Sequence, residues 1–440
     1  MGGFAAFAHR DFSLFMLAKF CTSVASQMLV VAVGWQVYQM TGRLIDLGLI
    51  GLSQFLPFVA LALFAGHAAD RFDRRRVLVL CNVALLACAL ALLAMTHYQV
   101  KSVAPIFIAL GGLGIARAFH APAAQAIMPN LVPPQAFSNA VALNSTSWQI
   151  ATVVGPSLGG VLYSLASGVM PATTGIGPSA GTGIGSSADS GAELVYAVVA
   201  GMFAAAVLLM SMTRAHKPAH ADSDFSMRQL LEGFRFVWQR KPVLGAISLD
   251  LFAVLFGGAT ALLPAFTRDV LHAGPDVFGL LRAAPGVGAG ITAVVLAFRP
   301  INRRVGAWMF GGVIVFGIAT IVYALSREVW LALLSLAVLG AGDMVSVFIR
   351  HILVQMETPD HIRGRVSSVN SVFIGASNEL GEFESGVTAA WFGLIPSLVL
   401  GGVLTLAVAF LWARVWFPML WRMNTFDEHT AEASSARIPK

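Results

Sequence analysis

Charged side chains are scarce in this 440-residue chain: Asp, Glu, Lys and Arg make up only 11% of it. A soluble domain carries roughly 25% of these residues. Because 57% of the chain is hydrophobic, most of its surface cannot face water. This composition excludes a soluble enzyme, a disordered chain and, despite the net charge of +6, a nucleic-acid-binding protein. The sequence predicts an integral membrane protein.

Cysteines and catalytic motifs are also sparse. The three cysteines all lie in apolar stretches, so we expect no disulfide framework. The sequence contains no G-x-x-x-x-G-K-[ST], HExxH or GxSxG motif and no His/Cys cluster with metal spacing. The weak glycine-rich repeats GIGPSA and GIGSSA have no strand before them, which argues against dinucleotide binding. We therefore expect no ATPase, no enzyme, no cofactor and no metal site.

Long apolar runs recur along the whole chain. A helix needs about 20 mostly apolar residues to cross the hydrocarbon core of a membrane. The runs are continuous rather than alternating, which favours helices over the strands of a barrel. The sequence predicts an all-α protein with twelve spans, at 12–38, 46–68, 77–96, 103–121, 138–164, 192–213, 243–266, 276–298, 305–325, 329–356, 365–393 and 396–420.

Basic residues are distributed unequally between the two sets of connections. One set, with both termini, holds most of the Lys and Arg, whereas the opposite set holds only Arg43, Lys101, Arg268 and Arg327. Cytoplasmic loops carry the excess of basic residues in membrane proteins. We expect a multi-pass protein of the cell inner (plasma) membrane, with both termini in the cytoplasm.

Two connections divide the chain. Residues 165–191 are rich in Gly, Ser and Thr and predict a periplasmic loop within an N-terminal six-helix half, 1–213. Residues 214–242 predict a cytoplasmic linker with an amphipathic helix on the membrane surface. A C-terminal half, 243–420, and a cytoplasmic tail, 421–440, follow.

The two halves show weak internal similarity. An offset of 228 residues places Arg75-Arg76-Val77 on Arg303-Arg304-Val305, and an offset of 226 places Asn144-Ser145 on Asn370-Ser371. Transporters often contain such repeats. We therefore predict two parallel six-helix halves.

Three motifs make the chain resemble the major facilitator superfamily. The segment GHAADRFDRRR (66–76) is close to the pattern G-x-x-x-D-R-x-G-R-R, with Asp73 in place of its glycine. Arg117 in the fourth span is similar to an arginine of that family, and GPSLGG (155–160) is similar to an antiporter motif. The phrases RDF (10–12) and NAVALN (139–144) resemble the branch of enterobactin-exporter-like transmembrane secretion effectors. The resemblance implies alternating access between two halves.

The same motifs supply the residues expected to control conformational change. Asp70 follows a helix end beside several arginines, where it can pair with a cation or cap a helix. Glycines in the fifth span allow close helix approach and bending. The expected gating residues are Gly66, Asp70, Arg71, Arg74, Arg75, Arg117, Gly155, Pro156, Gly159 and Gly160. The alternatives are that the arginines only anchor the topology and that the glycines only pack.

Carboxylates inside the spans are candidates for proton coupling. Each intramembrane charge costs about 2.5–3.5 kcal/mol on insertion scales, which makes it a functional hypothesis by default. The candidates are Asp250, Asp343, Glu379, Glu382 and Glu384. We expect the coupling chemistry above all at the three glutamates of the eleventh span; the alternative is that they face water or pair with arginines. Asp343 could instead form a structural ion pair with Arg350.

In the family that the chain resembles, spans one, four, seven and ten line the central cavity. This resemblance and the polar or aromatic residues of the fifth span give the substrate-cavity candidates Gln27, Trp35, Gln36, Tyr38, Asn144, Trp148, Gln149, Phe256 and Arg350.

The sequence thus predicts a secondary active transporter that exports a small amphiphilic molecule, siderophore- or drug-like, by proton antiport. Its expected partners are the small-molecule substrate, protons and the lipid bilayer, without nucleic acid, and we expect a monomer. The alternatives are a proton-coupled importer of the same fold and a non-transporting membrane sensor or scaffold.

Overall fold

The computed structural model describes residues 5–168, 186–214, 227–359 and 362–426. These residues are almost entirely helical and contain no strand. Eleven of their helices are long and apolar enough to cross a membrane. The prediction of an all-α membrane fold is therefore confirmed. Residues 169–185 of the predicted periplasmic loop, 215–226 of the predicted linker and 427–440 of the predicted tail lie outside the described residues.

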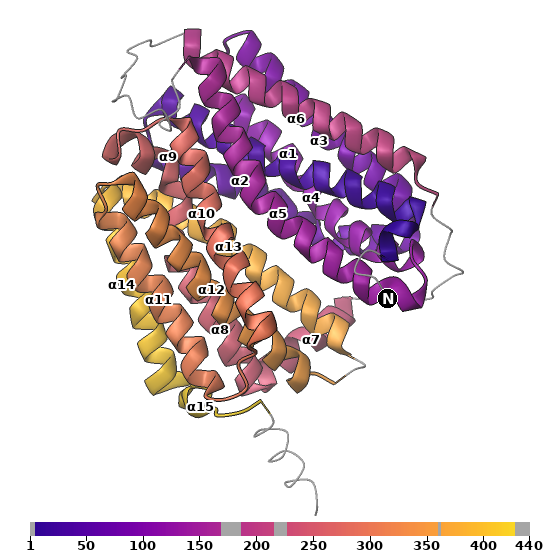
Figure 1. Cartoon of the computed structure of the whole chain (residues 1–440), viewed down its shortest axis with the longest axis vertical. Coiled ribbons are helices and arrows are strands. Elements are labelled where there is room, and N and C mark those ends of the chain that lie inside the picture. Colours follow the sequence, from indigo (N-terminus) through magenta and orange to yellow (C-terminus); the bar gives the residue numbers. More distant parts are fainter. Residues whose placement is uncertain (1–4, 169–185, 215–226, 360–361, 427–440) are drawn as a thin grey trace, which may run out of the picture. The chain divides into compact units, whose positions relative to one another are not determined.

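The first compact unit contains the first six long helices and the Leu263–Ala283 segment. Helix α1 packs against α5 and α6, α2 packs against α4, and α3 packs against α4 and α6. These helices are indigo to magenta in Figure 1. Their bounds are α1 Arg10–Thr41, α2 Leu44–Arg71, α3 Arg74–His97, α4 Ala104–Ile127, α5 Pro134–Ser167 and α6 Ser186–Met212.

Short polar or glycine-containing connections end the helices of this unit. Gly42 ends α1 with a φ of 61°, a left-handed conformation that glycine adopts without steric cost. Asp73 caps α3: its carboxylate accepts hydrogen bonds from the backbone N–H groups of Arg75 (2.9 Å) and Arg76 (3.4 Å). The Asp73 that departs from the family pattern therefore has a local structural role.

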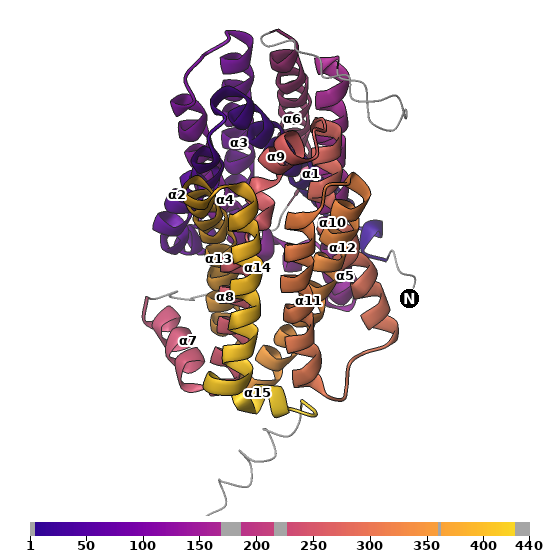
Figure 2. The same ribbon diagram turned by 90° about the vertical axis from the view of Figure 1, so that its left-hand side faces the viewer.

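The second compact unit contains the remaining long helices, except that Pro275–Ala283 of α10 belongs to the first unit. Its core includes Phe310, Val313, Leu353 and Trp412. Helix α11 packs against α12 and α14, and both Figure 1 and Figure 2 show these helices side by side. Helix α8 packs against α12, α13 and α14. The bounds are α7 Met227–Gln239, α8 Lys241–Phe256, α10 Pro275–Phe298, α11 Val305–Leu325, α12 Val329–Glu357, α13 Arg363–Phe392, α14 Leu394–Leu411 and α15 Pro418–Arg422.

The predicted seventh span, 243–266, is interrupted. Helix α8 ends at Phe256, and short helical segments, which include α9 (Leu263–Ala265), continue to Val270. At the interruption Gly258 packs on α13, where a Cβ atom would lie 2.6 Å from the carbonyl carbon of Gly381. A larger side chain could not approach so closely, which explains the glycine at this break.

Helix α13 corresponds to the predicted eleventh span but is not among the eleven apolar helices. It is 30 residues long, and it carries Arg363, Arg365 and the three candidate glutamates. Its lower hydropathy, rather than its length, distinguishes it from the other spans.

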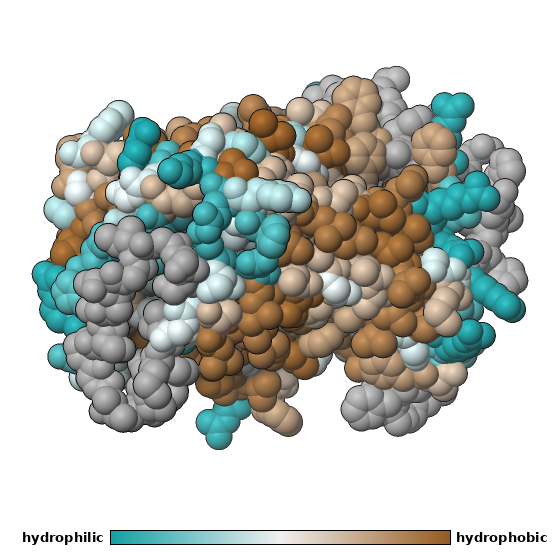
Figure 3. All heavy atoms as spheres, turned by 90° about the horizontal axis from the view of Figure 1, so that it is seen from above, coloured by the Kyte–Doolittle hydropathy of each residue, from teal (hydrophilic) through white to brown (hydrophobic). Residues whose placement is uncertain are grey.

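Large apolar side chains remain exposed on the described helices. Among them are Leu56, Phe64, Ile108 and Phe298. On the face drawn in Figure 3, apolar residues form broad areas beside hydrophilic patches. Lipid contact accounts for such a surface in a multi-pass membrane protein.

Candidate functional site

A buried ion pair connects α8 and α12 within the second unit. Nη1 of Arg350 lies 2.6 Å from Oδ2 of Asp250, and the two side chains are only 3% and 7% exposed. Removing one partner of such a pair leaves an uncompensated charge in a medium of low dielectric constant. Arg350, expected as a substrate-cavity residue, is thus placed in the interior of this unit and pairs with α8.

Asp343 adds a second carboxylate to this pair. It lies on α12 seven residues before Arg350, two turns away on nearly the same face. Its electrostatic partners include both Asp250 and Arg350. Two carboxylates and one guanidinium sum to one negative charge, which a single proton neutralises. We call Asp250, Asp343 and Arg350 the acidic triad.

A small cavity adjoins the acidic triad. Its volume is about 10 Å³, close to the minimum that holds one water molecule. Such a water could carry a proton between the two carboxylates. The cavity is lined by Asp250, Ala253, Val254, Val313, Phe316, Asp343 and Ser346.

The three glutamates of α13 are not among the residues that line this cavity. Glu379 and Glu382 are half-buried and make interactions with other residues. Glu384 is also half-buried, and no carboxylate partner or ion pair is found for its side chain among the described residues. Among the described residues, the glutamates of α13 and the acidic triad therefore do not share this cavity.

Arginines at the end of α2 and in the first turn of α3 flank the connection between these helices, and two of them contact the ends of neighbouring helices. Nη1 of Arg74 donates a 2.8 Å hydrogen bond to the carbonyl of Ala126 at the end of α4. Arg75 donates to the carbonyl of Ser211 at the end of α6, and Arg71 is exposed. Gly66 and Asp70 belong to α2, which ends at Arg71, so Asp70 lies just before the end of that helix rather than after it. Their side-chain positions lie outside the described part of the chain.

Arg117 lies on α4 and reaches α2. Its Nη1 donates a 3.1 Å hydrogen bond to Oε1 of Gln54. Helix α4 approaches α2 closely at this level, because a Cβ atom on Gly114 would be 2.9 Å from the carbonyl carbon of Gln54.

The GPSLGG motif brings α5 against two other segments of the first unit. A Cβ atom on Gly155 would lie 2.5 Å from Cβ of Gln27, and one on Gly159 would lie 3.1 Å from Cα of Met28, both on α1. Gly160 faces the start of α10, where its added Cβ would lie 2.9 Å from Cα of Gly279.

The motif's proline is part of the same contact. The carbonyl of Pro156 would meet a Cβ atom added to Gly279. The close contact between α5 and α10 thus lies at Pro275–Gly279. Further along α10, Gly288 packs against Ala337 of α12.

The candidate substrate residues of α1 have different surroundings. Gln36 is buried; its amide donates to Thr96 (3.0 Å) and its carbonyl accepts from the hydroxyl of Tyr196 (2.7 Å). Gln36 therefore connects α1 with α3 and α6.

Trp35 and Tyr38 instead contact the Leu263–Ala283 segment. Trp35 stacks on Phe278, with ring centroids 5.9 Å apart. The hydroxyl of Tyr38 donates to Asp269, and the guanidinium of Arg268 lies 5.7 Å from its ring centroid.

The remaining cavity candidates lie on α5 and α8. Trp148 is 52% exposed, and Gln149 is half-buried. Phe256 stacks on Phe252 at a centroid distance of 6.3 Å.

Asn144 reveals a charged residue that the sequence reasoning missed. Nζ of Lys19, on α1, donates a 2.6 Å hydrogen bond to Oδ1 of Asn144. Lys19 also interacts electrostatically with His120 of α4. The signal was available, because Lys19 falls inside the predicted span 12–38.

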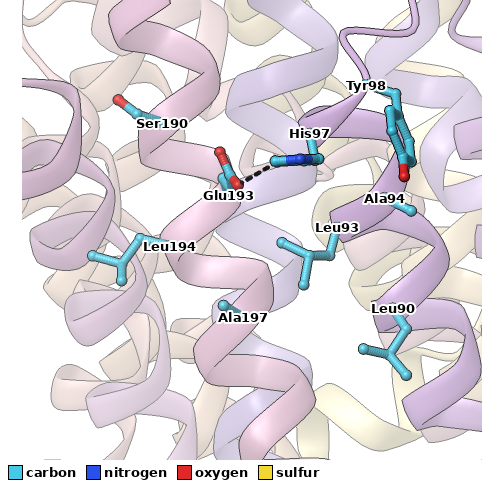
Figure 4. A pocket seen from close by; sticks show the side chains of 9 residues that line it. All are labelled: Leu90, Leu93, Ala94, His97, Tyr98, Ser190, Glu193, Leu194 and Ala197. Atoms are coloured by element: carbon cyan, nitrogen blue, oxygen red, sulfur yellow. Dashed lines mark hydrogen bonds and ion pairs between the residues drawn. The ribbon is translucent and has the colours of Figure 1, made fainter.

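A larger cavity lies between α3 and α6 in the first unit, with a volume of about 640 Å³. In Figure 4, leucines and alanines line one end of it, and His97 points toward Glu193 at the other. Nδ1 of His97 and Oε1 of Glu193 are 2.9 Å apart, and both side chains are exposed. This cavity does not include any residue of the acidic triad.

Comparison with known proteins defines the class. The sequence model of the Major Facilitator Superfamily matches residues 15–382. The chain belongs to the Major Facilitator Superfamily. Members of this family are transporters, so it is a multi-pass membrane transporter and not an enzyme.

Two kinds of curated relatives carry export in their names. The chain is 26% identical over 417 residues to the multidrug efflux pump Tap of Mycolicibacterium fortuitum, covering 89% of this chain and 94% of the relative. It is 27% identical over 371 residues to the enterobactin exporter EntS of Citrobacter koseri, covering 82% and 81% of the two chains.

Solved structures agree on the fold. A bacterial homologue of the human lysosomal transporter Spinster superposes with a TM-score of 0.73 at 17% identity, over 93% of this chain and 98% of that one. The nucleoside transporter NupG superposes with a TM-score of 0.69 at 13% identity, over 94% and 99%. The predicted fold and family are confirmed.

Proposed function

We propose that this transporter exports a small amphiphilic molecule, siderophore- or drug-like, in exchange for protons. The acidic triad is the observation that carries the proposal. When both carboxylates are ionised, the two carboxylates and one guanidinium carry one surplus negative charge, and an isolated charge in a membrane protein interior is costly. Binding of one proton removes that charge, and its release restores it.

The coupling cycle follows from these two charge states. A proton that enters from the outer side neutralises the triad, and either carboxylate holds it while the other keeps its attraction to Arg350. Release of the proton on the cytoplasmic side makes the triad negative again. A ligand that binds one of two conformations more tightly shifts the populations toward that conformation. Proton binding at the acidic triad therefore drives one half of an alternating-access cycle.

The relatives support export over import. Both the pump Tap and the exporter EntS are named for outward transport, and the GPSLGG motif resembles an antiporter motif. We propose a monomer in the inner membrane with both termini in the cytoplasm. Its halves would be 1–213 and 243–420, joined by 214–242.

We assign the gating role to the α2–α3 connection and the GPSLGG motif. Arg74 and Arg75 bind helix-end carbonyls, and Asp70 would hold this connection in one conformational state. Asp70→Asn should then slow transport without lowering the amount of protein in the membrane; an unchanged transport rate would contradict this role.

Transport into inverted membrane vesicles tests the proposed function. A panel of catecholate siderophores and amphiphilic antibiotics would be offered under an imposed pH gradient, acid inside. We expect at least one compound to accumulate, and a protonophore to abolish that accumulation. Two results would count against proton-driven export. In the first, vesicles that contain the protein accumulate no compound of the panel to a higher level than vesicles without it. In the second, accumulation persists when the protonophore is present.

A further inference from the structure

Lys19 is a cation placed within the membrane part of the first unit. It lies nine residues after the start of α1, about 14 Å along the helix axis. Its side chain is half-buried and reaches α5 rather than the helix end, so it does not extend along α1 toward the membrane surface. A lysine at the centre of a span costs about 2.5–3.5 kcal/mol on insertion scales, so a cation inside α1 calls for a function.

The charge of Lys19 has no counter-ion among the described side chains. No carboxylate lies within 4.0 Å of its ammonium group there, and its hydrogen bond goes to the neutral amide oxygen of Asn144. An ammonium group has three N–H donors, so Asn144 occupies one of them. The nearby His120 adds a further nitrogen donor rather than an anion.

The buried cation of the second unit, Arg350, has different surroundings. Arg350 is paired at 2.6 Å with Asp250 and has Asp343 as an electrostatic neighbour. The guanidinium therefore carries its neutralising anions within the protein. Lys19 does not, and an anion from outside the protein can complete its site.

Packing of α1 on α5 does not require the hydrogen bond from Lys19 to Asn144. Gly155 and Gly159 already place α5 directly on Gln27 and Met28 of α1. A neutral donor at position 19 would satisfy Asn144 without the cost of a charge. A purely structural role therefore leaves the charge itself unexplained.

We propose that Lys19, assisted by Asn144 and His120, binds an anionic oxygen group of the transported molecule, such as a carboxylate. The inference rests on the proposed export function and narrows its substrate class to amphiphiles that carry an anion. Lys19 would donate to the anion, Asn144 would orient the ammonium group, and His120 would supply a further donor. Anion recognition then lies in the first unit and proton binding in the second.

A pair of fluorescent probes that differ only in charge tests this assignment. The probes are 11-(dansylamino)undecanoic acid and its methyl ester, titrated onto the purified full-length protein. A charge-assisted hydrogen bond contributes about ten-fold or more in affinity. We therefore expect the wild-type protein to bind the acid at least ten-fold more tightly than the ester.

Three variants separate charge from structure. Lys19→Gln keeps a donor for Asn144 but removes the charge, and it should lose the preference for the acid while binding the ester normally. Lys19→Arg should retain most of the preference. Lys101→Met removes the charge of a lysine that is exposed before α4 and should behave like wild type. If Lys19→Gln does not purify as folded protein, Asn144→Leu, which should weaken binding of the acid selectively, takes its place.

Several outcomes would overturn the inference: equal affinity of wild type for the two probes, no binding of the acid, or parallel loss of both probes in Lys19→Gln. The titration uses no proton gradient, so it is independent of proton-driven export. The two proposals can fail separately. If export depends on protons but Lys19→Gln keeps the preference for the acid, the anion site is refuted and the proposed function stands.

Discussion

Arg350 is the residue on which the chemistry of the second unit depends. It lies within 2.6 Å of Asp250 and interacts with Asp343, so its position decides whether the two carboxylates can be ionised together. Both partners of the ion pair are nearly inaccessible, so bulk water cannot replace a lost partner. Substitution of one partner should therefore destabilise the folded protein more than substitution of both partners together.

A double-mutant comparison measures this dependence. Arg350→Met should lower the free energy of unfolding by about 3–5 kcal/mol because it leaves a carboxylate buried without its cation. Asp250→Asn should also destabilise, whereas the double variant Asp250→Asn/Arg350→Met should recover part of the loss. Thermal unfolding in detergent would report these effects as melting temperatures. A double variant whose melting temperature falls by the sum of the two single losses would show that the ion pair has no such energetic coupling.

At the scale of helices, glycines decide which segments approach one another. Gly155 places α5 on Gln27 of α1, and Gly381 places α13 on Leu255 of α8. The offset of 228 residues carries Gln27 to Leu255, and the offset of 226 carries Gly155 to Gly381. The internal similarity seen in the sequence thus corresponds to a recurring helix contact.

A bulky residue in the GPSLGG motif should block the movement of α5. In Gly159→Leu the new Cβ atom would lie 3.1 Å from Cα of Met28, so the helices must separate or stop sliding. We expect transport to fall at least ten-fold at unchanged membrane content. Gly201→Leu on α6 is the matched control, since nothing lies within 4 Å of its added Cβ. Wild-type turnover in Gly159→Leu would show that α5 need not move on α1 at this contact.

Single residues show how far the sequence alone could lead. Hydropathy predicted the spans and motifs predicted the family, because lipid imposes long apolar helices on any chain of this class. The three glutamates of α13 could be proposed as proton-coupling candidates from the sequence because they are close together in it. The acidic triad joins Asp250 to residues 93 and 100 positions later, and only the packing of α8 on α12 brings them together. Lys19 was overlooked although its position within an apolar run was visible.

At the scale of the whole molecule, the two units carry different kinds of charged residues. The first unit holds Lys19 and Arg117 within its helices, and the second holds the acidic triad and the glutamates of α13. Family membership establishes a transporter. We propose that one proton, bound at the acidic triad, is exchanged for each export step.

Proton movement in proteoliposomes tests that claim most directly. Purified wild-type protein and the Asp343→Asn variant would be reconstituted with a pH-sensitive dye inside, and a transported compound from the vesicle panel would be added outside. Glu328→Gln, which alters an exposed carboxylate, is the control. We predict compound-dependent proton flux for wild type and Glu328→Gln, and none for Asp343→Asn, which should still exchange the compound down its gradient. Wild-type proton flux in Asp343→Asn would contradict the account.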